Sequence, residues 1–209
     1  MNAYKTLAKS VCAEYLLKRS RFLCYTKPVS NEESAAAFVK EISAKHWDAR
    51  HNVWAYTLRE GQRARYSDGG EPQGTAGLPV LEALRSRGVT DAVVVVARYF
   101  GGILLGASGL TRAYAHSAGL GMEESGIMLM QPCVCLRLTL TYPQYAHFER
   151  ILENLGGVAA DTSFAENVTV TFDLPDAAQD KLLQALAEFA AGAKPEMLGS
   201  RFMQGGKQA

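Results

Sequence analysis

Strict alternation of apolar and polar residues marks the second part of the chain as a set of half-buried strands. Apolar side chains occupy every second position over 134–140 and again over 168–174, which is the period of a strand with one face in a core. The order of elements predicts a ferredoxin-like βαββαβ domain over 133–203, followed by a flexible tail at 204–209. The expected elements of this domain are strands at 134–140, 157–164, 168–174 and 195–203, and helices at 143–155 and 182–190.

The first part of the chain, 1–130, alternates less regularly and predicts a second mixed domain. The apolar run over 93–97 is continuous and lies in a segment bounded by turn residues, which is typical of a strand buried on both faces. Ser30 and Glu33 form a capping-box pattern that opens a helix. The expected elements are two strands within 10–28, strands at 51–58 and 92–99, a long polar loop at 59–75, and helices after Ser30, over 76–87 and over 108–123. The fold class is therefore α+β, with two domains.

The charge is unevenly divided between the two expected domains. The 209 residues carry 22 Lys and Arg against 21 Asp and Glu, a formal net charge of +1. Residues 1–130 hold 16 of the basic and 12 of the acidic side chains, whereas 131–209 hold 6 and 9. A mildly basic domain permits binding of nucleic acid or phosphate without requiring it.

The setting expected from the sequence is the cytoplasm, with no membrane contact. Charged residues interrupt the first twenty positions, so no secretory leader is expected, and no apolar stretch approaches the length that spans a bilayer. The four cysteines have no metal-binding or redox spacing, and we expect reduced thiols within strands. They are Cys12, Cys24, Cys133 and Cys135.

A glycine-punctuated run follows the buried strand. Arg98 and Tyr99 end the strand, and Gly101 and Gly102 then give a backbone that turns or approaches another group closely. Arg98 either pairs with a carboxylate at the edge of the core or recognises a phosphate or carboxylate ligand, and both readings stay open.

A second glycine-rich loop, 67–77, holds Asp68 and Glu71. It fits a structured turn, a loop that meets a ligand, or an acid–base or magnesium-binding pair. We expect residues in and beside the two glycine-rich segments to bind a phosphate-like anion. They are Arg50, His51, Asp68, Glu71, Gly74, Thr75, Arg98, Tyr99, Gly101, Gly102 and Arg112.

Basic side chains elsewhere in the first domain are the candidates for contact with nucleic acid. They are Lys18, Arg19, Arg21, Arg59, Arg63 and Arg65. The chain has no metal-ligand spacing, nucleophile–base pair, Walker A motif or G-x-G-x-x-G motif. We therefore expect no catalytic residue, metal or cofactor, and a binding module rather than an enzyme.

The two glycine-rich segments, together with three shorter ones, resemble the corresponding segments of the IMPACT/YigZ family. The strongest matches are S-D-G-G-E-P-Q-G-T-A-G-L-P at 67–79 and V-A-R-Y-F-G-G-I-L-L-G at 96–106, supported by 18–22, 49–52 and 109–114. Ala107 and Ser108 depart from the Thr-Gly of many members. The resemblance implies a first domain like domain 2 of ribosomal protein S5 and a second like the ferredoxin-like domains of elongation factor G. It also implies a link to regulation of translation, as in eukaryotic relatives.

Three functions compete on this basis. The preferred one is a module that binds RNA, the ribosome or a translation factor. The alternatives are an enzyme acting on a small phosphorylated or carboxylated substrate, and a scaffold for protein interactions. The first two require His51, Arg98 and the acidic loop to converge on one recess.

Overall fold

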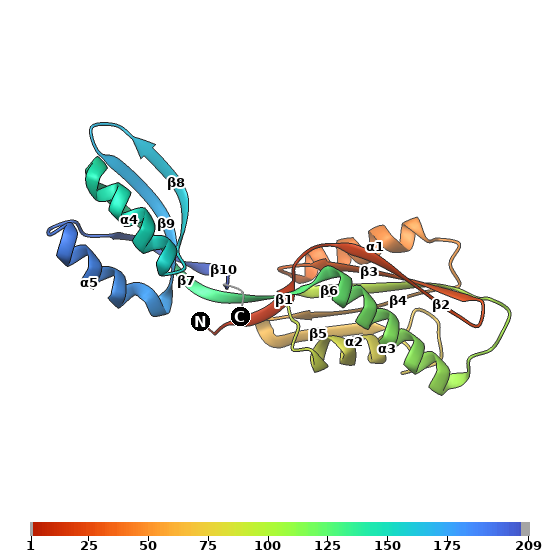
Figure 1. Ribbon diagram of the computed structural model, residues 1–209. Helices are drawn as coiled ribbons and strands as arrows, with labels where there is room; N and C mark the ends of the chain where they lie inside the picture. The colour runs from red at the N-terminus through yellow and green to blue at the C-terminus, as the bar shows by residue number, and fades with distance from the viewer. Residues whose placement is uncertain (1, 206–209) are drawn as a thin grey trace. The chain divides into compact units, whose positions relative to one another are not determined.

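The computed structural model describes residues 2–205 and divides the chain into two units (Figure 1). The N-terminal unit comprises Tyr4–Met128, and the C-terminal unit is built from Leu129 onward. Each unit has a hydrophobic core of its own. Of the expected tail, Gln204 ends a strand and Gly205 donates its N–H to the Leu129 carbonyl at 2.8 Å. Residues 206–209 lie outside the described residues.

The N-terminal unit is organised around one antiparallel sheet whose central strand is fully buried. The strand order is β2 (Val11–Leu17), β3 (Ser20–Pro28), β6 (Ala92–Tyr99), β4 (His51–Leu58) and β5 (Arg63–Ser67). In β6, every residue from Ala92 to Ala97 has no exposed surface. This confirms the strand that the continuous apolar run predicted.

Helices cover both faces of this sheet. Helix α1 (Glu32–Lys45) lies on one face, and α2 (Gly77–Ser86) and α3 (Gly106–Ser125) lie on the other (Figure 1). Because successive side chains of a strand point to opposite faces, Val93 and Val95 join the core beneath α1, whereas Val94 and Val96 join the core beneath α2 and α3.

Helix α3 packs closely on β3 because it carries a glycine at the contact. A Cβ placed on Gly121 would lie 2.6 Å from the Sγ of Cys24, so any side chain there would push the helix off the sheet. Burial raises the pKa of the Cys24 thiol, which stays protonated. All four cysteines are free and lie in strands.

The C-terminal unit is built from four strands of a five-stranded sheet, in which β1 also pairs with β7, and from two helices packed on it (Figure 1). Alternate residues of β9 are buried, from Val168 to Leu174, as the alternation predicted. The strand order is β10 (Glu196–Gln204), β7 (Ile127–Leu140), β9 (Val168–Pro175) and β8 (Val158–Phe164), and the helices are α4 (Tyr142–Asn154) and α5 (Gln179–Phe189). A short 3₁₀ turn, η2 (Asp176–Ala178), precedes α5.

Three local expectations were wrong. The expected loop at 59–75 contains a 3₁₀ turn, η1 (Glu60–Gln62), and the edge strand β5, whose residues are largely exposed and so lack an apolar period. Strand β1 (Tyr4–Leu7) was not foreseen. Helix α1 is capped by Asn31 rather than Ser30, because the Asn31 Oδ1 accepts the Ser34 N–H at 2.8 Å. Within the described residues, no helix is long and apolar enough to cross a membrane.

Candidate functional site

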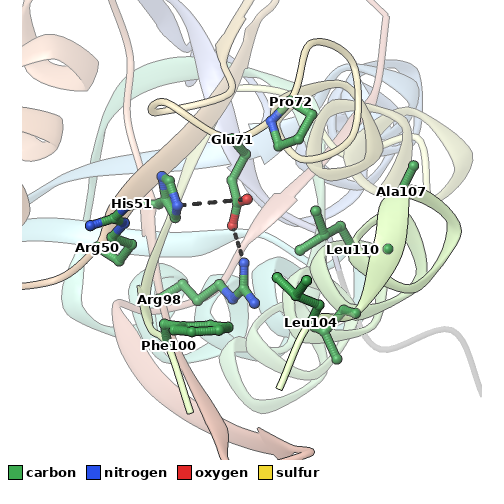
Figure 2. A pocket seen from close by; sticks show the side chains of 11 residues that line it. Arg50, His51, Glu71, Pro72, Arg98, Phe100, Leu104, Ala107 and Leu110 are labelled. Carbon is green, nitrogen blue, oxygen red and sulfur yellow. Dashed lines mark hydrogen bonds and ion pairs between the residues drawn. The ribbon is translucent and has the colours of Figure 1, made fainter. Parts of the chain in front are cut away.

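A cavity of about 700 Å³ lies in the N-terminal unit, where β4, β6, the 68–77 loop and the start of α3 meet (Figure 2). Charged side chains form one side of it, with Phe100 beside Arg98, and leucines lie on the other side. The lining residues are Arg50, His51, Glu71, Pro72, Arg98, Phe100, Leu104, Leu105, Gly106, Ala107 and Leu110. The structure thus brings together four of the predicted ligand-binding residues from three separate segments.

The Glu71 carboxylate is the centre of the polar wall. Its Oε1 accepts a hydrogen bond from Arg98 Nη1 at 2.6 Å and another from the Tyr114 hydroxyl at 2.8 Å. The side chains of Arg98 and Glu71 are only 6% and 3% exposed. Burial, followed by the negative charge of Glu71, raises the pKa of Tyr114, so the phenol remains a donor. Two donors therefore fix the carboxylate through one oxygen.

The second oxygen, Oε2, accepts no hydrogen bond from residues 2–205 but lies within ion-pair distance of His51. His51 Nε2 lies 3.7 Å from it, beyond hydrogen-bond distance, and no donor in residues 2–205 makes a hydrogen bond to it. His51 Nδ1 lies 3.0 Å from the carbonyl oxygen of Gly69. Because a carbonyl only accepts, Nδ1 carries the hydrogen. Figure 2 shows the carboxylate lying between His51 and Arg98.

Arg98 is held from several sides, and its Nε still makes no hydrogen bond. It is opposite His51 in the β4–β6 register, and its carbonyl accepts the Arg50 N–H at 3.0 Å. The guanidinium lies over the rings of Phe22 and Phe100, 5.5 and 5.7 Å from their centroids. Its buried Nε has no hydrogen-bond partner, which is uncommon for a buried charged group.

Close backbone approach at Gly101 shapes the site. A Cβ on Gly101 would lie 2.0 Å from the carbonyl carbon of Arg19, so only glycine fits there. The Gly101 N–H also donates to Ser20 Oγ at 3.3 Å. These contacts place the β2–β3 turn, Lys18 and Arg19, against the glycine run beside Phe100.

The start of α3 faces the cavity with Gly106 and Ala107. Leu105 occupies the cap position, and no side chain accepts the first amides of the helix. Unsatisfied amides at a helix start carry a partial positive charge that favours anions.

Asp68 and its neighbours stabilise the loop and do not line the cavity. Asp68 Oδ1 accepts the N–H groups of Ala76 and Gly77 at 3.1 and 2.8 Å, and Oδ2 accepts that of Gly74 at 2.9 Å. Thr75 Oγ1 donates to the Pro72 carbonyl at 2.6 Å. The carboxylate of Asp68 thus holds the start of α2 and the turn before it.

Tyr99 and Arg112 also lie outside the cavity. Tyr99 follows Arg98 in β6 and so points to the face beneath α1, where its hydroxyl is 2.9 Å from Asp48 Oδ1 and from His46 Nδ1. Arg112 shares a neighbouring hollow with Lys18. Gly102 has a φ of +83° and makes the turn after β6.

The six basic residues predicted to contact nucleic acid fall at two ends of the sheet. Arg21 pairs with Tyr99 in the β3–β6 register, at the end beside the cavity, together with Lys18 and Arg19. Arg59 and Arg63 lie at or beyond Leu58 of the β4–β5 hairpin, and Arg65 lies opposite Tyr56, near the opposite end of β6. Seven residue steps of β6 separate the two ends, roughly 20 Å.

Comparisons with known proteins agree with each other. Residues 18–121 match the Impact N-terminal domain, and 138–193 match a domain of unknown function (DUF1949). The chain is 36% identical to the IMPACT family member YvyE of Bacillus subtilis, over 80% of this chain and 78% of the relative. It is 34% identical to the IMPACT family member YigZ of Escherichia coli, over 84% and 88%. The chain belongs to the IMPACT family.

The two-unit α+β architecture is also shared with a solved structure, described as the crystal structure of a hypothetical protein. The TM-score is 0.61 at 31% sequence identity, and the match covers 93% of this IMPACT-family chain and 97% of the other.

Two kinds of site residue were missed in this IMPACT-family sequence. Tyr114, which donates to Glu71, lies four residues after Leu110 on α3, and this spacing places both on one helix face. Leu104 and Leu105 were treated as part of the glycine run rather than as a cavity wall. Within residues 2–205, no three His, Cys, Asp or Glu side chains gather as metal ligands would.

Proposed function

We propose that this chain is an RNA-binding protein with a role in the regulation of translation, and that RNA binds at the cavity end of the N-terminal unit. The observation that carries the proposal is a group of cations without acidic partners at that end. They are Lys18, Arg19, Arg50 and Arg112, and among the described residues no carboxylate lies within ion-pair distance of any of them.

The carboxylates at the same end are already occupied. Glu14 pairs with Arg21 at 2.6 Å, and Glu71 pairs with Arg98. Asp48 accepts from Tyr99. Because the phenol of Tyr99 is neutral, Asp48 keeps its charge, but the cations without ion-pair partners outnumber it at this end, which favours association with phosphates.

Exposed aromatic rings accompany these cations. Trp47 is 83% exposed and Phe100 is 47% exposed. The turn that carries Trp47 is held firmly, because the adjacent His46 ring contacts the hydroxyls of Tyr25 and Tyr99 at 2.8 and 2.9 Å. Rigid exposed rings beside unpaired cations suit single-stranded RNA, whose bases stack on aromatic side chains.

The other basic group provides an internal contrast. Arg59 pairs with Asp91, and Arg63 and Arg65 both pair with Glu32. Their charge is largely compensated within the protein, so we assign them a structural role in the β4–β5 hairpin rather than a role in RNA binding.

We also propose that the expected domains, 1–130 and 133–203, are an S5 domain 2-like fold and a ferredoxin-like fold. The second assignment is supported by the strand order β10-β7-β9-β8 with helices α4 and α5, which follows a βαββαβ chain order. The first is supported by the match of 18–121 to the Impact N-terminal domain.

The test is fluorescence anisotropy with a labelled single-stranded RNA over a range of salt concentrations. One variant combines Lys18→Gln, Arg19→Gln and Arg112→Gln, and the matched control combines Arg59→Gln, Arg63→Gln and Arg65→Gln. We expect the first to lower the slope of log affinity against log salt by about 2, since each lost single-strand phosphate contact contributes about 0.7. Equal losses in both variants, or affinity that does not respond to salt, would refute the proposal.

A further inference from the structure

We infer that the cavity holds one nucleotide of the bound RNA, with its phosphate at the start of α3 and a hydroxyl or amino group at Glu71. This inference rests on the proposed function and assigns a ligand to the cavity. Its volume of about 700 Å³ lies within the range of small-molecule sites.

The Glu71 carboxylate in the cavity is a hydrogen-bond acceptor, so we expect the ligand to carry a hydrogen-bond donor. Glu71 is almost fully buried, yet its Oε2 receives no hydrogen bond from residues 2–205. Oε2 is not fully enclosed by the protein, so a ligand that displaces water from it must offer a donor in return. A ribose hydroxyl or an exocyclic amino group supplies that donor without bringing negative charge to the carboxylate, whereas inorganic phosphate at neutral pH offers its O–H only on an anion, and a fatty acid chain offers no donor.

The cavity also offers a place for an anion. The uncapped amides at the start of α3 border it through Gly106 and Ala107, and helix starts of this kind bind phosphate groups. Arg50 lies at the rim beyond His51 (Figure 2). An anion at α3 and a donor at Glu71 require a ligand that carries both groups.

The remaining wall suits a flat apolar face. Leu104, Leu105 and Leu110 line it, Leu104 is 83% exposed, and Phe100 adds an aromatic ring beside Arg98. A base has such a face, and stacking against aromatic and apolar side chains is the usual way in which a base is held outside a duplex. A nucleotide combines the anion, the donor and the flat face within a single unit of the RNA chain.

The experiment measures binding of nucleoside 5′-monophosphates to the full chain by calorimetry, and their ability to displace labelled RNA. Ala107→Trp places a large side chain on a lining residue that is exposed. Thr111→Trp, one turn further along α3 and also exposed, is the matched control outside the cavity. We expect Ala107→Trp to weaken monophosphate binding at least tenfold and Thr111→Trp to leave it unchanged.

A second variant probes the acceptor. Glu71→Gln replaces one carboxylate oxygen by a donor, and circular dichroism checks that it folds. We expect weaker binding of each monophosphate in this variant, and weaker binding of the nucleoside and of inorganic phosphate than of the monophosphate in the unmodified chain.

The outcomes separate this inference from the proposed function. If RNA binds with the expected salt dependence but monophosphates do not bind, or bind equally well to Ala107→Trp, the nucleotide pocket is refuted and RNA binding stands. If monophosphates bind and RNA does not, the proposed function is refuted and the ligand chemistry of the cavity is supported. If neither binds, both are refuted.

Discussion

The Glu71–Arg98 pair links the stability of the N-terminal unit to the chemistry of its cavity. Both side chains are almost fully buried, and one carboxylate oxygen accepts from Arg98 and from Tyr114. Loss of either partner leaves the other as an uncompensated buried charge. The pair therefore fixes the position of Oε2, which we assign to the ligand.

Replacement of Arg98 by alanine should destabilise the N-terminal unit by about 3–5 kcal/mol, because Glu71 would remain buried without its cation. Urea unfolding followed by circular dichroism measures the change. Arg21→Ala is the control, since Arg21 forms an exposed pair with Glu14 and should cause far less loss. Similar losses in the two variants would show that burial of the Glu71–Arg98 pair has no special energetic role.

His46 should make the stability of the unit depend on pH. Burial lowers its pKa below the ordinary value of 6.5, and Lys45 lowers it further while Asp48 opposes the shift. Below pH 6.5, His46 binds a proton more readily in the unfolded chain than in the folded one. The contribution of His46 to the free energy of unfolding is therefore complete above about pH 6.5 and declines as the pH falls below that value. His46→Gln should flatten the profile of unfolding free energy between pH 5 and 7.5, and an unchanged profile would contradict the assignment.

The sequence pattern indicated which side chains converge on the recess, but not every contact that these side chains make. The sequence led us to expect His51, Glu71 and Arg98 at one recess, and the register of β4 with β6 places His51 opposite Arg98. Tyr99 was grouped with Arg98, although adjacent residues in a strand point to opposite faces. Tyr114 gave no signal as a partner of Glu71, because the contact joins segments 43 residues apart.

At the scale of elements, the loop between β5 and α2 depends on one carboxylate. Asp68 accepts three backbone N–H groups at the start of α2 and in the turn before it. It thereby satisfies amides that the helix itself leaves without acceptors.

Asp68→Ala should therefore destabilise the N-terminal unit by about 2 kcal/mol, the upper range for loss of a cap. Asp68→Asn keeps one acceptor oxygen and should recover part of that loss. Thermal unfolding of the two variants beside the unmodified chain provides the comparison. Equal stability of Asp68→Ala and the unmodified chain would mean that water replaces the carboxylate.

Elements with a strong apolar period were predictable, and those without it were not. Strand β9 and helix α5 follow their periods, whereas β5 is an edge strand with mostly exposed side chains. Its place in the sheet comes from backbone pairing with β4, from Trp54 opposite Ser67 to Leu58 opposite Arg63. Backbone pairing leaves no mark on the hydrophobic pattern.

At the scale of the whole molecule, the two units have separate cores. The C-terminal core gathers residues from both helices and from the alternating strands β7 and β9. Because the cores are separate, we expect a destabilising substitution in one unit to leave the stability of the other unit unchanged.

Leu182→Ala removes a buried side chain of α5 and should destabilise the C-terminal unit by about 3 kcal/mol. Hydrogen exchange followed by mass spectrometry should show faster exchange in α4, α5 and β9, with the amides of β6 unaffected. Faster exchange in β6 as well would show that the two units unfold together.

The close approach of Gly121 in α3 to Cys24 in β3 sets the distance between the helix and the sheet at that point. The start of the same helix, at Ala107, borders the cavity, and the two positions are separated by roughly 21 Å along the axis at 1.5 Å per residue. A methyl group at position 121 would push the C-terminal end of α3 away from the sheet and would tilt the start of the helix, which borders the cavity. If the cavity binds the proposed nucleotide, a substitution at Gly121 should therefore weaken that binding although residue 121 does not line the cavity.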